Sequence, residues 1–250
     1  LAMPLDEALT RIGARAKRKR ALVERIGDDS VKRSDLETED RTALKDLLHL
    51  QLVEAVLPDA VPVSHGGTGF IRKYPLTEVQ SAVVASITGG LGRYKVHLIH
   101  GITGSGKTEI YFHLIADVIA AGKQALVLVP EIALTPALRA AFAERFPDAV
   151  ISIQHSAMPE QVRVAGWIDA QTGTAQIVVG TRLAALAPMA NLGLIVVDEE
   201  QDASFKQQEG LRYSARDVAI YRASQCTVPV VLCSATPSLE SYQHALTGRY

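Results

Sequence analysis

The residues Gly101-Ile102-Thr103-Gly104-Ser105-Gly106-Lys107-Thr108 identify the class of fold to which this chain belongs. They fit the pattern G-x-x-x-x-G-K-[S/T] of a phosphate-binding loop. An apolar run at residues 96–100 precedes them and predicts a strand, and a helical pattern at residues 107–121 follows. Glycines let such a loop turn its backbone N–H groups onto a phosphate, toward which the following helix points its positive end. We therefore expect a nucleotide to bind at Gly101, Thr103, Gly104, Ser105, Gly106, Lys107 and Thr108.

Short apolar runs alternate with helical patterns around this loop. Further strands are predicted at residues 125–129, 150–154, 177–179, 194–197 and 230–233. Helices are predicted at residues 159–170 and after Thr135-Pro136, where threonine is the N-cap and proline takes the first helical position. Apolar strands that alternate with helices form a parallel sheet covered on both faces. The predicted fold is therefore α/β, with ligands at the carboxyl ends of the strands.

Two acidic residues, Asp198 and Glu199, follow the predicted strand at residues 194–197. An ordinary turn is one explanation, but carboxylates at the end of a buried strand are costly unless they meet a cation. Beside a phosphate loop that cation would be Mg²⁺, held by Asp198 and the Thr108 hydroxyl. Glu199 would then orient and deprotonate the attacking water, and Lys107 would contact the phosphates. The predicted catalytic residues are Lys107, Asp198 and Glu199, acting on ATP with Mg²⁺.

Two roles are open to Gln80. Its side-chain amide can pair with the edge of an adenine. It also lies three residues after Thr77, which is the spacing of a helix-capping box. The two roles are compatible, and the residues alone do not separate them.

Composition excludes several classes of protein. An apolar fraction of 48% and a charged fraction of 21% exclude disordered and collagen-like chains. The net charge of −1 argues against a general affinity for nucleic acid, although it leaves local patches open. Two cysteines, Cys226 and Cys233, are too few for a disulfide framework or a four-thiolate zinc site. With no membrane-length apolar run and no signal peptide, the chain is expected to be cytoplasmic and not to bind membranes.

A second, smaller domain is predicted before the nucleotide-binding one. Prolines and glycines cluster near residues 58–75 and predict a linker at residues 59–75, between a domain at residues 1–58 and one at residues 76–250. Residues 1–58 have the apolar spacing of amphipathic helices, and we predict a small winged-helix-like module. Its basic helix would either contact phosphates or form a solvated face. That helix is expected to carry Arg11, Arg15, Lys17, Arg18, Lys19, Arg20 and Arg25.

The motifs at residues 101–111, 129–136, 180–182, 197–200 and 233–237 occur in the order of a superfamily 2 helicase. The run at residues 204–217, Ser-Phe-Lys-Gln-Gln-Glu-Gly-Leu-Arg-Tyr-Ser-Ala-Arg-Asp, resembles the aromatic-rich loop of the PriA family of bacterial replication-restart helicases. The resemblance is strong at residues 76–250 and weaker at residues 1–58, where the family has a winged helix. It implies the RecA-like first lobe of an ATP-driven DNA helicase, with Gln80 as the adenine-reading glutamine.

The resemblance also implies residues that contact forked or single-stranded DNA, or that couple DNA to the nucleotide. Helix N-termini, arginines and aromatic rings suit phosphates and bases. Phe205 and Tyr213 could instead anchor their loop to the domain. Ser234 and Thr236 could instead cap a helix that begins at Pro237. The candidates are Thr135, Thr181 and Arg182 for the DNA backbone, Phe205 and Tyr213 for base stacking, Lys206, Arg212 and Arg216 for phosphates, and Ser234 and Thr236 for coupling.

Some features of the family are expected to lie outside these 250 residues. They are a second RecA-like lobe with an arginine finger, a zinc-binding cysteine module and an amino-terminal domain for DNA 3′ ends. The resemblance therefore implies a piece of a longer protein, namely a winged helix and the first motor lobe. Alone, this piece is expected to bind nucleotide weakly and to hydrolyse it slowly or not at all. Single-strand-binding protein and other primosome proteins are the implied partners.

Two residues depart from the family pattern, because Gln201 and Ser214 stand where histidine is usual. Glutamine forms hydrogen bonds but does not change charge near neutral pH. This departure leaves open a catalytically weak DNA-binding scaffold for primosome loading. A second alternative is a P-loop kinase or metabolic NTPase. The presence of both Asp198-Glu199-Glu200 and Ser234-Ala235-Thr236 argues against it. Stimulation of turnover by DNA, rather than by a metabolite, would separate these classes.

Overall fold

The computed structural model describes residues 5–12, 16–27, 36–53 and 69–250. Contacts within the chain divide it into two units, Leu1–Pro58 and Asp59–Tyr250. Each unit is described by itself. Within the described residues, no helix is both long enough and apolar enough to cross a membrane.

The described part of the first unit consists of three helices, α1 (Leu5–Arg11), α2 (Lys17–Ile26) and α3 (Thr38–His49). The described basic residues of the stretch predicted as one basic helix lie in two helices, and Arg15 lies outside the described part. Their apolar faces meet in a small core that includes Leu22, Val23 and Leu47. No strand lies among the described residues of this unit, and the hairpin of a winged helix is not seen in them. Residues 28–35 and 54–68, which include most of the predicted linker, lie outside the described part.

Three of the five cations on α2, namely Arg18, Lys19 and Arg25, are paired with carboxylates within the unit. The Arg18 guanidinium contacts Glu37, Glu39 and Asp40, and the Lys19 ammonium lies 2.7 Å from an Asp46 carboxylate oxygen. Neutralised cations attract phosphate weakly. Of the two roles predicted for the basic run, the solvated and internally paired helix face is the one that these contacts favour.

A parallel sheet of six strands forms the centre of the second unit, in the order β1-β8-β5-β2-β4-β3. The six apolar runs predicted from sequence are these strands. Their bounds are β1 Val96–His100, β2 Gln124–Leu128, β3 Ile151–Gln154, β4 Ile177–Gly180, β5 Leu192–Asp198 and β8 Val230–Ser234.

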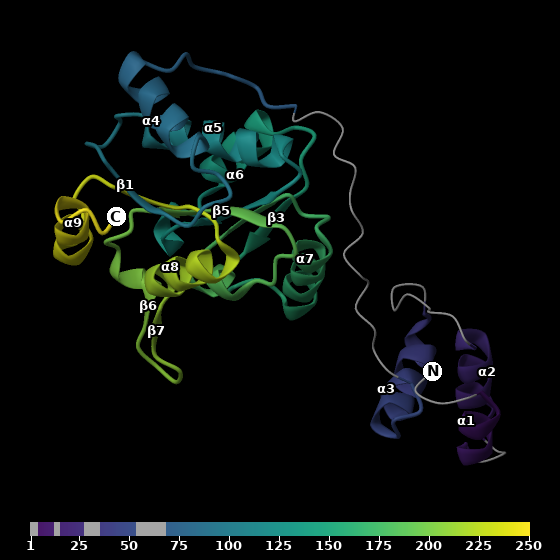
Figure 1. Ribbon diagram of the computed structural model, residues 1–250. Coiled ribbons are helices and arrows are strands. Elements are labelled where there is room, and N and C mark those ends of the chain that lie inside the picture. Colours follow the sequence, from purple (N-terminus) through teal and green to yellow (C-terminus); the bar gives the residue numbers. More distant parts are fainter. Residues whose placement is uncertain (1–4, 13–15, 28–35, 54–68) are drawn as a thin grey trace. The chain divides into compact units, whose positions relative to one another are not determined.

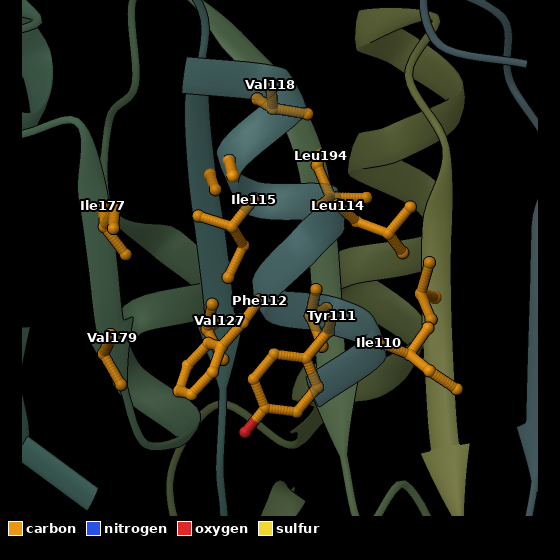
Figure 2. Close-up of a cluster of buried hydrophobic side chains, with 14 of the residues drawn as sticks. Ile110, Tyr111, Phe112, Leu114, Ile115, Val118, Val127, Ile177, Val179 and Leu194 are labelled. Atoms are coloured by element: carbon orange, nitrogen blue, oxygen red, sulfur yellow. The ribbon is translucent and has the colours of Figure 1, made fainter. Parts of the chain in front are cut away.

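Helices cover both faces of the sheet (Figure 1). One face carries α4 (Glu78–Thr88), α5 (Lys107–Ala120) and α6 (Pro136–Arg145), and the other carries α7 (Glu160–Thr172) and α8 (Ala215–Cys226). Figure 2 shows how α5 lays Tyr111, Leu114 and Ile115 over the central strands. This three-layer arrangement confirms the predicted α/β class and is that of a RecA-like lobe.

Four elements near the end of the chain, β6, β7, α8 and α9, were not fully predicted. The hairpin of β6 (Lys206–Gln207) and β7 (Tyr213–Ser214) projects from the lobe and leads directly into α8 (Figure 1). The last helix, α9, spans Leu239–Leu246 and has Ser238 as its N-cap. It does not begin at Pro237, so Ser234 and Thr236 do not cap it.

Residues 69–73, at the end of the predicted linker, pack onto the lobe. The Phe70 ring stacks on Phe146 at 5.1 Å between centroids, and the Arg145 guanidinium lies 4.9 Å from the same ring. The Ile71 N–H donates to the Arg145 carbonyl, and the Lys73 ammonium pairs with Glu144 at 2.9 Å. We call these residues the entry segment.

Candidate nucleotide and DNA site

Three neighbouring strands bring the nucleotide motifs together at one edge of the sheet. In the register of the sheet, His100 of β1 lies opposite Ser234 of β8, and Cys233 of β8 lies opposite Asp198 of β5. The phosphate loop follows β1, Asp198 ends β5 with Glu199 directly after it, and Ser234 ends β8. Because parallel strands share the direction of their carboxyl ends, residues more than a hundred positions apart in sequence become neighbours.

The phosphate loop has the backbone that its glycines predict. Gly104 and Gly106 adopt φ angles of +80° and +83°, which only glycine adopts without strain. Lys107 is 8% exposed, and its ammonium donates to the carbonyls of Gly101 at 2.7 Å and Ile102 at 3.3 Å. The Lys107 charge is thus held at the mouth of the loop by two neutral carbonyl acceptors. A phosphate oxygen would take the place of these carbonyls.

Asp198 is a half-buried carboxylate at the end of β5. Its two oxygens accept hydrogen bonds from the Tyr111 hydroxyl at 3.3 Å and from the Glu199 N–H at 3.1 Å. Burial raises the pKa of Asp198, and the neighbouring Glu199 carboxylate raises it further. In Figure 2 the Tyr111 hydroxyl points away from the apolar cluster. A cation beside Asp198 would reverse the penalty that this carboxylate bears.

The residues at this edge fit a nucleotide-bound Mg²⁺. Asp198 and the exposed Thr108 hydroxyl offer two oxygen ligands. Among the described residues no three His, Cys, Asp or Glu side chains form a metal cluster. This donor set suits Mg²⁺, which is commonly bound through one or two protein oxygens together with phosphates and water.

A chain of hydrogen bonds joins Glu199 to the end of β8. The Gln201 amide donates to a Glu199 carboxylate oxygen at 2.9 Å and accepts from the Ser234 hydroxyl at 2.5 Å. The Ser234 hydroxyl accepts in turn from the Thr236 N–H at 2.9 Å. Glutamine therefore bridges the acidic motif and the Ser-Ala-Thr motif with one donor and one acceptor, and neither bond depends on protonation.

The Gln80 side chain is engaged at both ends. Its oxygen accepts from the Thr77 N–H at 2.8 Å, which completes the capping box predicted from the spacing. Its nitrogen donates to the Ser105 carbonyl in the phosphate loop at 2.9 Å. Gln80 thus ties α4 to the loop, and an adenine contact remains a prediction.

The predicted DNA-backbone residues lie near the same edge with different exposure. Thr135 is the exposed N-cap of α6, where its hydroxyl accepts from the Leu138 N–H. Thr181 is 2% exposed at the end of β4. The Arg182 guanidinium donates to the carbonyls of Ser204 and Lys206, which fixes the base of the β6–β7 hairpin. Thr135 is therefore the most accessible of the three.

The aromatic residues of the hairpin region differ from the expectation. Phe205 is 1% exposed in the core under α8, so its ring presents no face to a base. Tyr213 is half-buried against the same core. Anchoring of the hairpin is the role that this packing supports, because stacking on a base needs an open ring face. Lys206 and Arg212 are exposed and remain candidates for phosphate contact.

Arg216 also differs from the expectation. Its side chain is 11% exposed and contacts Glu200, Asp217 and Glu240. These carboxylates raise the pKa of Arg216, although its burial opposes them. Arg216 is therefore held inside an ion-pair network and does not extend into solvent toward a phosphate.

Two groups at the site were missed by sequence reasoning. Tyr111 lies one helical turn after Lys107, and that spacing alone would have placed it beside the loop. The second is the ion pair of Glu109 and Arg145, whose oxygen and nitrogen atoms approach to 2.5 Å and 2.6 Å. Arg145 follows Glu109 by 36 residues, so no local pattern announces their contact.

Comparison with known proteins identifies the family. The model of the family described as "DEAD/DEAH box helicase" matches residues 77–245. The chain belongs to this family. Replication restart protein PriA of Bacillus subtilis is 47% identical to it over 178 residues, which cover 70% of this chain and 22% of the relative. PriA of Haemophilus influenzae is 46% identical over 157 residues, which cover 63% and 21% of the two chains. The predicted resemblance to PriA is confirmed.

A solved structure supports the fold. A structure of RecG bound to a three-way DNA junction aligns with a TM-score of 0.51 and 22% identity, over 71% of this chain and 23% of RecG. At that identity the alignment supports the helicase-lobe fold alone. The chain spans only about a fifth of the length of the PriA relatives it matches, so an activity of whole PriA remains a proposal for this protein.

Proposed function

We propose that this chain provides the ATP-binding motor lobe, preceded by a winged-helix-like unit, of an ATP-dependent DNA helicase that restarts replication in the cytoplasm. The observation that carries the proposal is the carboxyl edge of β1, β8 and β5. There the phosphate loop, the acids Asp198 and Glu199, and the Ser234 hydroxyl lie on adjacent strands. The similarity to replication restart proteins supports DNA as the polymer acted on.

In this proposal each residue of the edge has one task. Lys107 releases the loop carbonyls and binds the β- and γ-phosphates of ATP. Asp198 and Thr108 hold Mg²⁺, which when bound neutralises charge on the phosphates. Glu199, already oriented by the Gln201 amide, positions the attacking water and accepts its proton.

Contact between the lobe and DNA is proposed at the exposed residues Thr135, Lys206 and Arg212 around the carboxyl edge. The Gln201, Ser234 and Thr236 hydrogen bonds provide a route by which the nucleotide state reaches the end of β8. Single-strand-binding protein and other primosome proteins are proposed partners, by analogy with PriA. We further propose that a second lobe, supplied by a longer protein, completes the site, and that these 250 residues alone turn over ATP slowly or not at all.

The deciding experiment measures ATP turnover by the protein at its natural length, with and without forked DNA. Wild-type protein is compared with Glu199→Gln, which keeps the shape of the side chain but cannot accept a proton. We expect DNA to stimulate wild-type turnover and the variant to lose about 100-fold or more of it. Glu144→Gln, a charge change in the exposed pair with Lys73, is the control and should behave as wild type.

Two results would reject the proposal. Tight DNA binding without turnover would favour the scaffold function that Gln201 left open. Turnover stimulated by a small metabolite and indifferent to DNA would favour a metabolic NTPase.

A further inference from the structure

The second glutamate of the acidic motif, Glu200, is fully buried and makes contacts unlike those of its neighbours. Its side chain is 0% exposed. One oxygen accepts from the Ser238 N–H at 2.7 Å, and the other accepts from the Ser241 hydroxyl at 2.9 Å and from the Arg216 guanidinium at 3.0 Å. A buried carboxylate with several charge-assisted hydrogen bonds is held in one place.

This anchor lies next to a strained residue. Glu199 has a φ angle of +50°, in the left-handed region that a residue with a side chain seldom adopts. Such a conformation is strained and persists only where the surroundings enforce it. The surroundings here are the Glu200 contacts, together with the Glu200 N–H, which donates to the Cys233 carbonyl of β8 at 3.0 Å.

Arg216 connects the same anchor to the hairpin. It is the second residue of α8, which begins directly after β7 ends at Ser214. Besides Glu200, the guanidinium donates to the Ser238 hydroxyl at 2.9 Å and to Glu240 at 3.1 Å, both near the start of α9. A displacement of the hairpin base would therefore reach Glu200 through a single side chain.

We infer that Arg216 and Glu200 are positioning residues for ATP hydrolysis, whose buried ion pair holds Glu199 in its left-handed conformation and links it to the base of the β6–β7 hairpin. This inference rests on the proposed function. The positioning role replaces the phosphate contact predicted for Arg216. Neither Arg216 nor Glu200 touches ATP or DNA in this role. The pair acts on the water-activating step, so it affects the rate of hydrolysis and not the binding of either ligand.

The test compares Arg216→Lys, Glu200→Gln and the double variant at natural length, measuring kcat and KM for ATP with forked DNA and the Kd for that DNA. Lysine keeps the charge of Arg216 but cannot contact three carboxylates in fixed geometry. Each single variant should lower kcat about tenfold or more, since small displacements of a catalytic group have large effects on rate. KM and Kd should stay within about threefold of wild type. The double variant should be no slower than the worse single variant, because the two residues act as one unit.

The two alternatives predict other results. If Arg216 contacts phosphate, Glu200→Gln frees it and tightens DNA binding, and the inference is overturned. If the pair only stabilises the fold, the variants lower the melting temperature but keep wild-type kcat per nucleotide-binding site, counted with a fluorescent ATP analogue. That result also overturns it. A wild-type protein without DNA-stimulated turnover would instead reject the proposed function itself.

Discussion

Asp198 shows at the scale of one residue how function opposes stability. The carboxylate is half-buried, lies within electrostatic range of the Glu199 carboxylate, and accepts hydrogen bonds from the Tyr111 hydroxyl and the Glu199 N–H. Its raised pKa means that the folded protein favours the neutral acid more than the unfolded chain does. The ionised form therefore destabilises the nucleotide-free lobe at pH values above the folded pKa. This destabilisation is absent below the ordinary aspartate pKa of about 4.

We predict that Asp198→Asn stabilises the nucleotide-free protein at pH 8 by about 1 kcal/mol, as replacements at strained functional sites often do. The gain should shrink as the pH is lowered, because wild-type Asp198 then takes up a proton. Urea unfolding at pH 8 and at about pH 4, near the ordinary aspartate pKa, measures both effects, with Asp169→Asn on α7 as the control. The same variant should weaken Mg²⁺–ATP binding, and a variant that is less stable at pH 8 would contradict the account.

At the scale of an element, the contact of α7 with β3 depends on one glycine. A Cβ at Gly166 would lie 2.2 Å from the Gln154 amide nitrogen and 2.6 Å from the Ser152 hydroxyl. Gln154 is fully buried and Ser152 is 8% exposed, so neither has space to retreat. Helix propensity alone favours alanine over glycine by about 1 kcal/mol.

Packing should prevail over propensity, and we expect Gly166→Ala to destabilise the lobe by about 1–3 kcal/mol. Gly90→Ala is the matched control, because its Cβ would have its nearest contact at 3.4 Å, on the Ile87 carbonyl. That variant should be neutral or slightly stabilising. Chemical denaturation of both variants checks the prediction, and equal stability would show that α7 moves away from the sheet without cost.

Local patterns predicted the elements that carry strong local signals. The six strands are short and mostly apolar runs, and Thr135-Pro136 marks the start of α6. Helix α8 was missed because its buried residues are the alanines Ala215, Ala219 and Ala223, which give little amphipathic contrast. The order of strands and the pairing of Arg216 with Glu200 depend on contacts distant in sequence. The same is true of the burial of Phe205, which its aromatic side chain alone did not distinguish from a base-stacking position.

At the scale of the molecule, the lobe begins earlier than the composition break suggests. The predicted domain starts at residue 76, yet Phe70 and Ile71 contact Arg145, which is 2% exposed. The Arg145 guanidinium also pairs with Glu109 directly after the phosphate loop. The Arg145 Nε also donates a hydrogen bond to the Ile71 carbonyl at 2.5 Å. Without the entry segment, this buried cation would lose a hydrogen bond and one of its two aromatic neighbours, Phe70 and Phe112.

We therefore predict that a protein of residues 69–250 is more stable than one of residues 76–250 by about 2–4 kcal/mol, as expected for uncovering a buried ion pair and an aromatic ring. Urea unfolding of the two proteins gives the difference directly. Lys73→Ala in the longer protein is the control and should cost less than about 1 kcal/mol, because its pair with Glu144 is exposed. Phe70→Ala should reproduce much of the loss without shortening the chain. If the two lengths unfold at the same urea concentration, the entry segment is a tether that rests on the lobe without stabilising it.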